Sequence, residues 1–164
     1  APIFCGSEAG FQNWVDDTNE VIKTNLLREG RRLVIEGQAK VILTEYHNPL
    51  NTESIFLKAF SIYPSCLLRG LPVADLYRRS EDALHSTNSM FEDMAASAGP
   101  ERVRLARVHS NFHGRESSQP VCGTAPPDIA GTWIQVLDCF HPNSNGAENF
   151  ANAVNAAVRQ PLSQ

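Results

Sequence analysis

The sequence lacks several features that mark common functional classes. It has no cluster of lysine or arginine residues, and its 18 acidic residues outnumber its 14 basic residues, which gives a formal net charge of -4. Nucleic-acid-binding proteins normally carry a basic surface patch, so we expect no nucleic-acid partner. No apolar run approaches the roughly 20 residues that cross a bilayer, so we expect no transmembrane segment. Internal repeats and low-complexity tracts are also missing from the sequence.

The cysteines show no Cys-x-x-Cys spacing, which argues against a zinc knuckle. Cys5, Cys66, Cys122 and Cys139 all fall in segments that are typical of loops. An even number of loop cysteines favours two disulfides and an oxidising compartment, although four unpaired thiols are the alternative. No signal peptide is visible, but the cysteines lead us to expect a secreted or otherwise extracytoplasmic protein.

Helical and strand patterns alternate along the chain. Apolar residues recur near helical spacing in three segments, 13–35, 72–97 and about 145–158. Two short segments, 40–46 and 102–108, are apolar or alternating and rich in β-branched residues, which is typical of strands. Alternation of this kind, in a chain of this length, predicts a single α/β domain over residues 1–164 with a parallel sheet.

Loops that follow the strands of a parallel sheet lie at the same end of that sheet. Ligands of open α/β sheets bind at this carboxyl end, so we expect the loops after residues 46 and 109 to converge there with the turn 138–141. Cys66 and Cys122 follow the two strands. We therefore predict a Cys66–Cys122 disulfide, which leaves Cys5–Cys139 as the second.

The segment Asp138-Cys139-Phe140-His141-Pro142-Asn143 is the most informative motif of the chain. It places a carboxylate and an imidazole three residues apart, in a turn directly before a helix. A histidine that acts as a general base needs a second group that fixes its tautomer and stabilises its charged form. Asp138 is suited to that role for His141. The alternative is that both residues only cap the final helix and fill a turn.

The motif resembles the last conserved block of the GDSL-type, or SGNH, serine hydrolases. Phe112-His-Gly-Arg-Glu116 and Cys122 are similar to the Phe-x-Gly-His-Glu…Cys segment of the secreted actinobacterial lipases and esterases in that family. Further segments follow the family's order, namely strand 40–46 with Pro49, Cys66-Leu-Leu-Arg-Gly-Leu, the helix with Asn88, and strand 102–108. The resemblance implies a three-layer, flavodoxin-like parallel-sheet fold.

The family's nucleophilic Gly-Asp-Ser block has no good match in this chain. Cys5-Gly-Ser-Glu8 is only weakly similar to this block. The family's oxyanion-hole glycine and its Gly-x-Asn-Asp block have no counterpart in the chain. The chain therefore resembles the C-terminal part of such a hydrolase. The resemblance implies that the serine lies on a missing or separate N-terminal partner chain, and that the substrate is an ester, either a lipid or an acylated small molecule.

By the same resemblance, His141 would deprotonate the serine hydroxyl and Asp138 would orient His141. Trp133, Phe140 and His113 are the candidate substrate contacts, and ordinary packing or loop positions are the alternative for all three. No metal and no organic cofactor is implied.

Two alternatives remain open. His109 and His113 lie four residues apart and would offer a metal site together with His47 or Glu116, but their segment is typical of a loop, where that spacing does not place both on one helix face. A chain without the nucleophile would also suit a non-catalytic module that binds sugar or lipid on a degenerate hydrolase scaffold, because a fold does not fix a function.

Overall fold

The computed structural model describes residues 5–33, 39–48, 58, 61–109 and 144–160. Its elements are, in chain order, α1 (Glu8–Arg31), β1 (Val41–Thr44), α3 (Pro64–Leu67), α4 (Val73–Ala98), β2 (Val103–Ala106) and α6 (Ser144–Arg159). The three long helices and two strands expected from the sequence are all present. Among the described helices, none has the length and hydropathy that crossing a membrane requires.

The first helix begins earlier than its apolar periodicity predicts, at Glu8 rather than at residue 13. Ser7 is the reason, because its side-chain oxygen accepts a hydrogen bond from the backbone N–H of Gly10 at 3.1 Å. A serine in this position satisfies one of the N–H groups that have no partner in the first turn of a helix.

The two strands pair in parallel, as predicted, with Val41 opposite Val103 and Thr44 opposite Ala106. Both strands are shorter than the segments 40–46 and 102–108. Main-chain hydrogen bonds continue the pairing beyond the last strand residues, since the N–H of Glu45 donates to the carbonyl of Ala106 at 3.1 Å.

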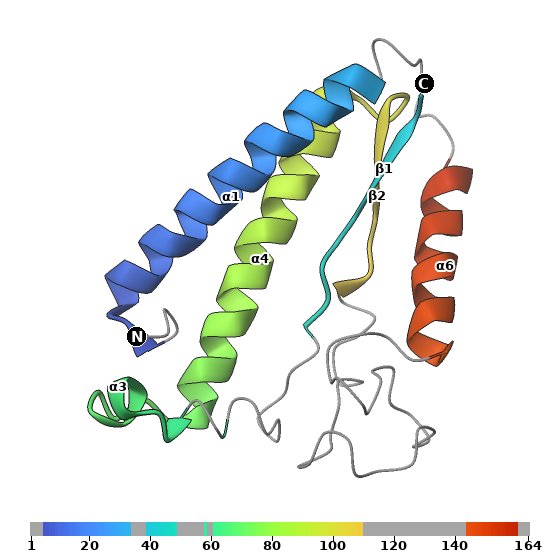
Figure 1. Cartoon of the computed structure of the whole chain (residues 1–164). Coiled ribbons are helices and arrows are strands. Elements are labelled where there is room, and N and C mark those ends of the chain that lie inside the picture. The colour runs from blue at the N-terminus through green and yellow to red at the C-terminus, as the bar shows by residue number, and fades with distance from the viewer. Residues whose placement is uncertain (1–4, 34–38, 49–57, 59–60, 110–143, 161–164) are drawn as a thin grey trace.

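Helices cover both faces of this two-stranded sheet (Figure 1). On one face, Ile42, Ala106 and Val108 pack against the small residues Ala153 and Ala157 of α6. On the opposite face, the side chains of Val41, Leu43 and Val103 point toward α1 and α4. The described residues therefore form a three-layer α/β arrangement in which the strands are apolar on both sides, as buried parallel strands are.

Helices α1 and α4 lie side by side and run in the same direction (Figure 1). The first turn of α1 meets the second turn of α4, where Glu8 pairs with Arg79 at 3.0 Å. Further along, Asn19 donates to Ser86 at 3.0 Å and accepts from Thr87 at 2.8 Å. Polar contacts at two levels thus fix the register of the two helices as well as their direction.

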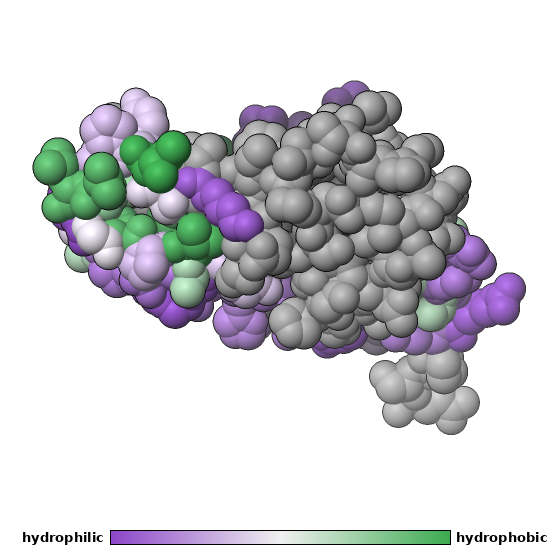
Figure 2. Space-filling view, turned by 90° about the horizontal axis from the view of Figure 1, so that it is seen from below, coloured by the Kyte–Doolittle hydropathy of each residue, from purple (hydrophilic) through white to green (hydrophobic). Residues whose placement is uncertain are grey.

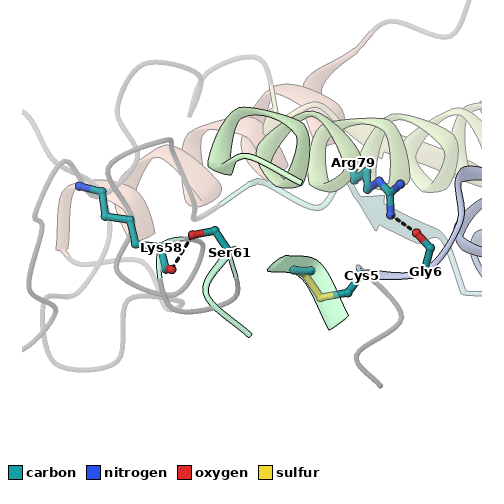
Figure 3. The surroundings of a disulfide bond; sticks show 6 residues. Cys5, Gly6, Lys58, Ser61 and Arg79 are labelled. Atoms are coloured by element: carbon teal, nitrogen blue, oxygen red, sulfur yellow. Dashed lines mark hydrogen bonds between the residues drawn. A yellow bond between two sulfur atoms is a disulfide. The ribbon is translucent and has the colours of Figure 1, made fainter. Parts of the chain in front are cut away.

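Arg79 is the centre of the contact at the helix starts. Its side chain is only 4 % exposed and pairs with Glu8, and it also donates to the carbonyl of Gly6 at 2.9 Å (Figure 3). The guanidinium stands over the ring of Phe11, 5.4 Å from the centroid. Arg78, which is more exposed, donates to the same carboxylate and is the main cause that lowers the pKa of Glu8.

A disulfide joins Cys5 to Cys66, so the predicted pairings Cys66–Cys122 and Cys5–Cys139 are wrong (Figure 3). Cys122 and Cys139 lie outside the described residues. Helix packing, rather than the loops after the strands, brings these two cysteines together. Because α1 and α4 are parallel neighbours, the segments just before their first turns are also neighbours. Cys5 occupies the first of these segments and Cys66 the second.

Replacing both Cys5 and Cys66 by serine should lower the free energy of unfolding by about 4 kcal/mol, because closing a loop on the order of 60 residues restricts the unfolded chain by that amount. Urea denaturation of the oxidised protein and of the variant measures the difference. Peptide mapping without reduction is the companion test. A linked peptide that contains Cys66 and Cys122 would contradict the assignment.

Candidate functional site

The residues that the sequence predicts for catalysis, His141 and Asp138, lie outside the described residues. The same holds for the candidate substrate contacts Trp133, Phe140 and His113. Their roles therefore stay predictions. What the structure describes is the end of the sheet toward which they were expected to converge.

Buried and half-buried polar side chains gather where the two strands end. They come from the residues just after β1, from the residue three positions beyond β2, and from α4. We call this group the strand-end cluster, and its members are Glu45, Asn48, Ser80, Glu81, Asn88 and His109. Sequence reasoning singled out His109 as a metal candidate and Asn88 within the family resemblance, but none of the other four.

Glu45 joins the ends of the two strands. One carboxylate oxygen accepts the backbone N–H groups of both Val108, at 2.9 Å, and His109, at 3.1 Å. The other oxygen faces Arg107 at 3.4 Å, although the Glu45 side chain itself is only 7 % exposed. A buried carboxylate is tolerated when charged donors and N–H groups surround it, as here. Glu45 therefore holds His109 in place through its main chain.

Glu81 contacts the side chain of His109, and Asn48 in turn holds Glu81. The Asn48 amide donates to Ser80 at 3.0 Å and also to one carboxylate oxygen of Glu81. The second oxygen of Glu81 lies 3.5 Å from Nε2 of His109. Ser80 donates its own hydroxyl proton to the carbonyl of Tyr77 at 2.7 Å, so its oxygen is tied to the helix. Glu81 and His109 thus form a carboxylate–imidazole pair, and Ser80 is not arranged as a nucleophile.

Asn88 clamps the chain as it leaves β1. It accepts from the backbone N–H of Tyr46 and donates to the carbonyl of the same residue, both at 2.9 Å. Two hydrogen bonds to one residue reproduce the pairing that a further strand residue would provide. Asn88 is 6 % exposed, so both bonds are shielded from water. The direction of the chain after β1 is therefore set by a side chain of α4.

The last helix runs opposite to the strands, so its start lies at the strand-end cluster. In the first half of α6, Phe150 meets His47 ring edge to face, with centroids 5.4 Å apart. At the other end of the helix, Arg104 of β2 donates to the carbonyl of Ala157 at 2.9 Å. Ser144, at which α6 begins, therefore lies at the carboxyl end of the sheet (Figure 1).

A cleft of about 860 Å³ lies between α1, α4 and the sheet. The cleft is lined by apolar side chains of α1, β1 and α4, namely Leu27, Leu43 and Met94. Polar side chains such as Lys23 and Asp93 complete the lining. Val41 and Leu43 of β1 and Val103 of β2 lie at its floor, so the cleft faces both strands of the sheet. Sequence periodicity gave no sign of it, because α1 has the pattern of an ordinary amphipathic helix.

No group of three or more His, Cys, Asp or Glu side chains in the described part of the chain is placed to hold a metal ion. The alternative metal site combines His109 and His113 with His47 or Glu116, and both His113 and Glu116 lie outside that part.

Substituting Asn88 by alanine should lower the free energy of unfolding by about 2 kcal/mol, because both main-chain groups of Tyr46 lose a partner. Urea denaturation measures the effect. Asn13→Ala, on the exposed side of α1, is the matched control and should stay close to wild type. Equal stability of the two variants would show that the Asn88 clamp contributes nothing.

The chain matches no family model, and neither the curated proteins nor the solved structures include one significantly similar to it.

Proposed function

We propose that this chain is the C-terminal part of an SGNH-type ester hydrolase, in which His141 is the general base and Asp138 orients it. The position of Ser144 supports the proposal best. Ser144 begins α6 at the carboxyl end of the sheet, and His141 precedes it by three residues. Consecutive Cα atoms are about 3.8 Å apart, so the chain tethers His141 within roughly 11 Å of Ser144.

The carboxyl end of a parallel sheet is also where ligands of open α/β folds bind. Here that end carries a buried polar cluster held by hydrogen bonds from three elements. Asn48 and Glu81 place polar side chains there, of the kind that fix orientation in a mainly apolar site. Such an ordered group of polar side chains is more typical of a reaction site than of a surface that serves only for packing.

The proposed reaction is acyl transfer through a serine. His141 takes the hydroxyl proton as the serine oxygen attacks the ester carbonyl, and it returns that proton to the leaving alcohol. Asp138 stabilises the imidazolium formed in between. Water then attacks the acyl-serine in the same way, which releases the acid and restores the serine. Ser80 is excluded from this role because its hydroxyl is bound to Asn48 and to the carbonyl of Tyr77.

The serine is proposed to come from a partner segment that adds a strand beside β1. Helices α1 and α4 cover the same face of the sheet, and successive crossovers in such sheets have the same hand. Because α4 leads from β1 to β2, a strand that leads through α1 to β1 belongs on the other side of β1. Residues of both α1 and β1 line the cleft, so a strand added on that side would border it.

The main chain of β1 fits this placement. In a parallel ladder alternate residues bond to one neighbour, and Val41 and Glu45 donate their N–H groups to β2. Ile42 and Thr44 therefore present their main-chain groups to the opposite edge. A strand added there would cover that edge and rest beneath α1. We expect such a contact to bury an area in the obligate range, roughly 2,000 Å² or more.

The catalytic proposal predicts that His141→Ala lowers ester turnover by several orders of magnitude in the active assembly, as loss of a triad member does. Asp138→Asn should lower it less severely. The control is His85→Ala, an exposed histidine on α4, which should leave turnover unchanged. Turnover of short-chain aryl esters and labelling by a fluorophosphonate provide the readout. Wild-type turnover in His141→Ala would remove the assignment, and a lone monomer that never reacts with the probe would favour a sugar- or lipid-binding module.

The partner proposal makes a separate prediction. Leu27 lines the cleft and is 41 % exposed, so Leu27→Asp should weaken association with the serine-bearing segment, on the order of tenfold, by placing a charge in an apolar contact. The control is Val21→Asp, at an exposed position of α1 outside the cleft lining. Intact-mass analysis and denaturing electrophoresis identify the segment. If residues 1–164 expressed alone give a soluble, cooperatively folding monomer with a high melting temperature, no partner strand is required.

A further inference from the structure

An exposed apolar surface surrounds the short helix α3. It consists of Ile62, Tyr63, Leu67 and Leu68, whose exposed fractions are 72 %, 47 %, 65 % and 88 %. We call these four residues the α3 patch. Figure 2 shows green, hydrophobic side chains gathered at one edge of the molecule, and the exposed Ile62, Leu67 and Leu68 are of this class. Isolated exposed apolar residues are ordinary, but a contiguous group on one small element marks an interaction surface.

The α3 patch is held rigidly. Cys66, in the middle of α3, is fully buried and bonded to Cys5, and Leu71 and Tyr77 pack against this pair. The N–H of Leu68 donates to the carbonyl of Pro64 at 2.9 Å, which closes the helical turn. The buried disulfide therefore fixes one side of α3 and leaves its leucines outside. A surface that is already ordered loses little entropy on binding.

The patch lies at the functional end of the molecule. Pro72, four residues after Leu68, is the N-cap of α4, and the first half of α4 supplies Ser80 and Glu81 to the strand-end cluster. Figure 1 shows α3 at the end of the molecule at which both strands finish. A partner bound on the α3 patch would therefore be close to the strand-end cluster.

An exposed cation adjoins the patch. Arg69 follows Leu68 directly in the chain and is itself exposed. Apolar side chains, a tyrosine and a flanking cation together match a lipid surface, where acyl chains lie beneath anionic headgroups. Four side chains are few for a second copy of the chain, since a stable protein contact buries roughly 800 Å² on each partner.

We propose that the α3 patch docks the protein on an anionic lipid surface. Ile62, Leu67 and Leu68 enter the boundary between headgroups and acyl chains, and Arg69 stays among the headgroup phosphates. This inference rests on α3 alone and does not need the catalytic proposal. Where the chain acts in an ester hydrolase, docking presents the active site to esters held in a lipid layer rather than to dissolved ones.

Sedimentation with phospholipid vesicles tests the docking. We expect the oxidised protein to bind phosphatidylcholine vesicles that contain roughly one-third phosphatidylserine, and to bind pure phosphatidylcholine several-fold more weakly. The double variant Ile62→Ser/Leu68→Ser should reduce partitioning by at least about tenfold, since two large apolar groups no longer leave water. Val21→Ser/Val158→Ser removes side chains that are 61 % and 56 % exposed on α1 and α6, and should bind like wild type.

Arg69 provides the electrostatic arm of the test. Arg69→Gln should bind anionic vesicles on the order of fivefold more weakly than wild type and so lose most of the preference for them. Its binding should also depend less on salt concentration than that of wild type. Circular dichroism and thiol titration confirm that each variant keeps its fold and its Cys5–Cys66 bond.

Three outcomes overturn the proposal. The first is wild-type protein that sediments with neither vesicle. The second is equal binding by Ile62→Ser/Leu68→Ser and the control. The third is a concentration-dependent dimer that forms without lipid and disappears in the same variant, which would make the patch a self-association surface. His141→Ala should bind vesicles like wild type, so a failure of docking and a failure of catalysis are told apart.

Discussion

The parallel pairing of β1 with β2 is the interaction on which the rest of the structure depends. Parallel strands cannot be joined by a tight turn, so the chain between them has to cross one face of the sheet, and α4 is that crossing. Once α4 covers one face, the opposite face needs its own cover, which α6 provides through Ala153 and Ala157. The layers therefore follow from the direction in which two four-residue strands run.

The same pairing creates the strand-end cluster. Two strands that end side by side leave main-chain groups at their last residues without ladder partners, and those groups need other hydrogen bonds. Glu45 supplies an acceptor for the N–H groups after β2, and Asn88 supplies a donor and an acceptor to Tyr46 after β1. The polar side chains at this end thus have a structural duty of their own. A site that uses them for binding would be built on residues that are already immobilised.

Much of the fold could be predicted from residue patterns. The disulfide pairing and part of the strand-end cluster could not, and both failures have physical causes. Helices α1, α4 and α6 were predictable from their apolar period, and β1 from a run of β-branched residues. The disulfide was mispredicted because sequence pattern says nothing about which helices are neighbours, and Cys5 meets Cys66 only through the packing of α1 on α4. Ser80 and Glu81 were missed because polar residues on a long helix usually face solvent. Here they face the end of the sheet, which only the tertiary arrangement decides.

The Cys5–Cys66 bond also changes how a cut in the chain would show itself. The two cysteines are 61 residues apart, and α1 and β1 both lie between them. A protease that cleaves any peptide bond in this interval opens a covalent ring but frees no fragment. The two pieces would remain one particle until a reductant separates them. The mass of such a nicked molecule under oxidising conditions would differ from that of the intact chain only by one added water.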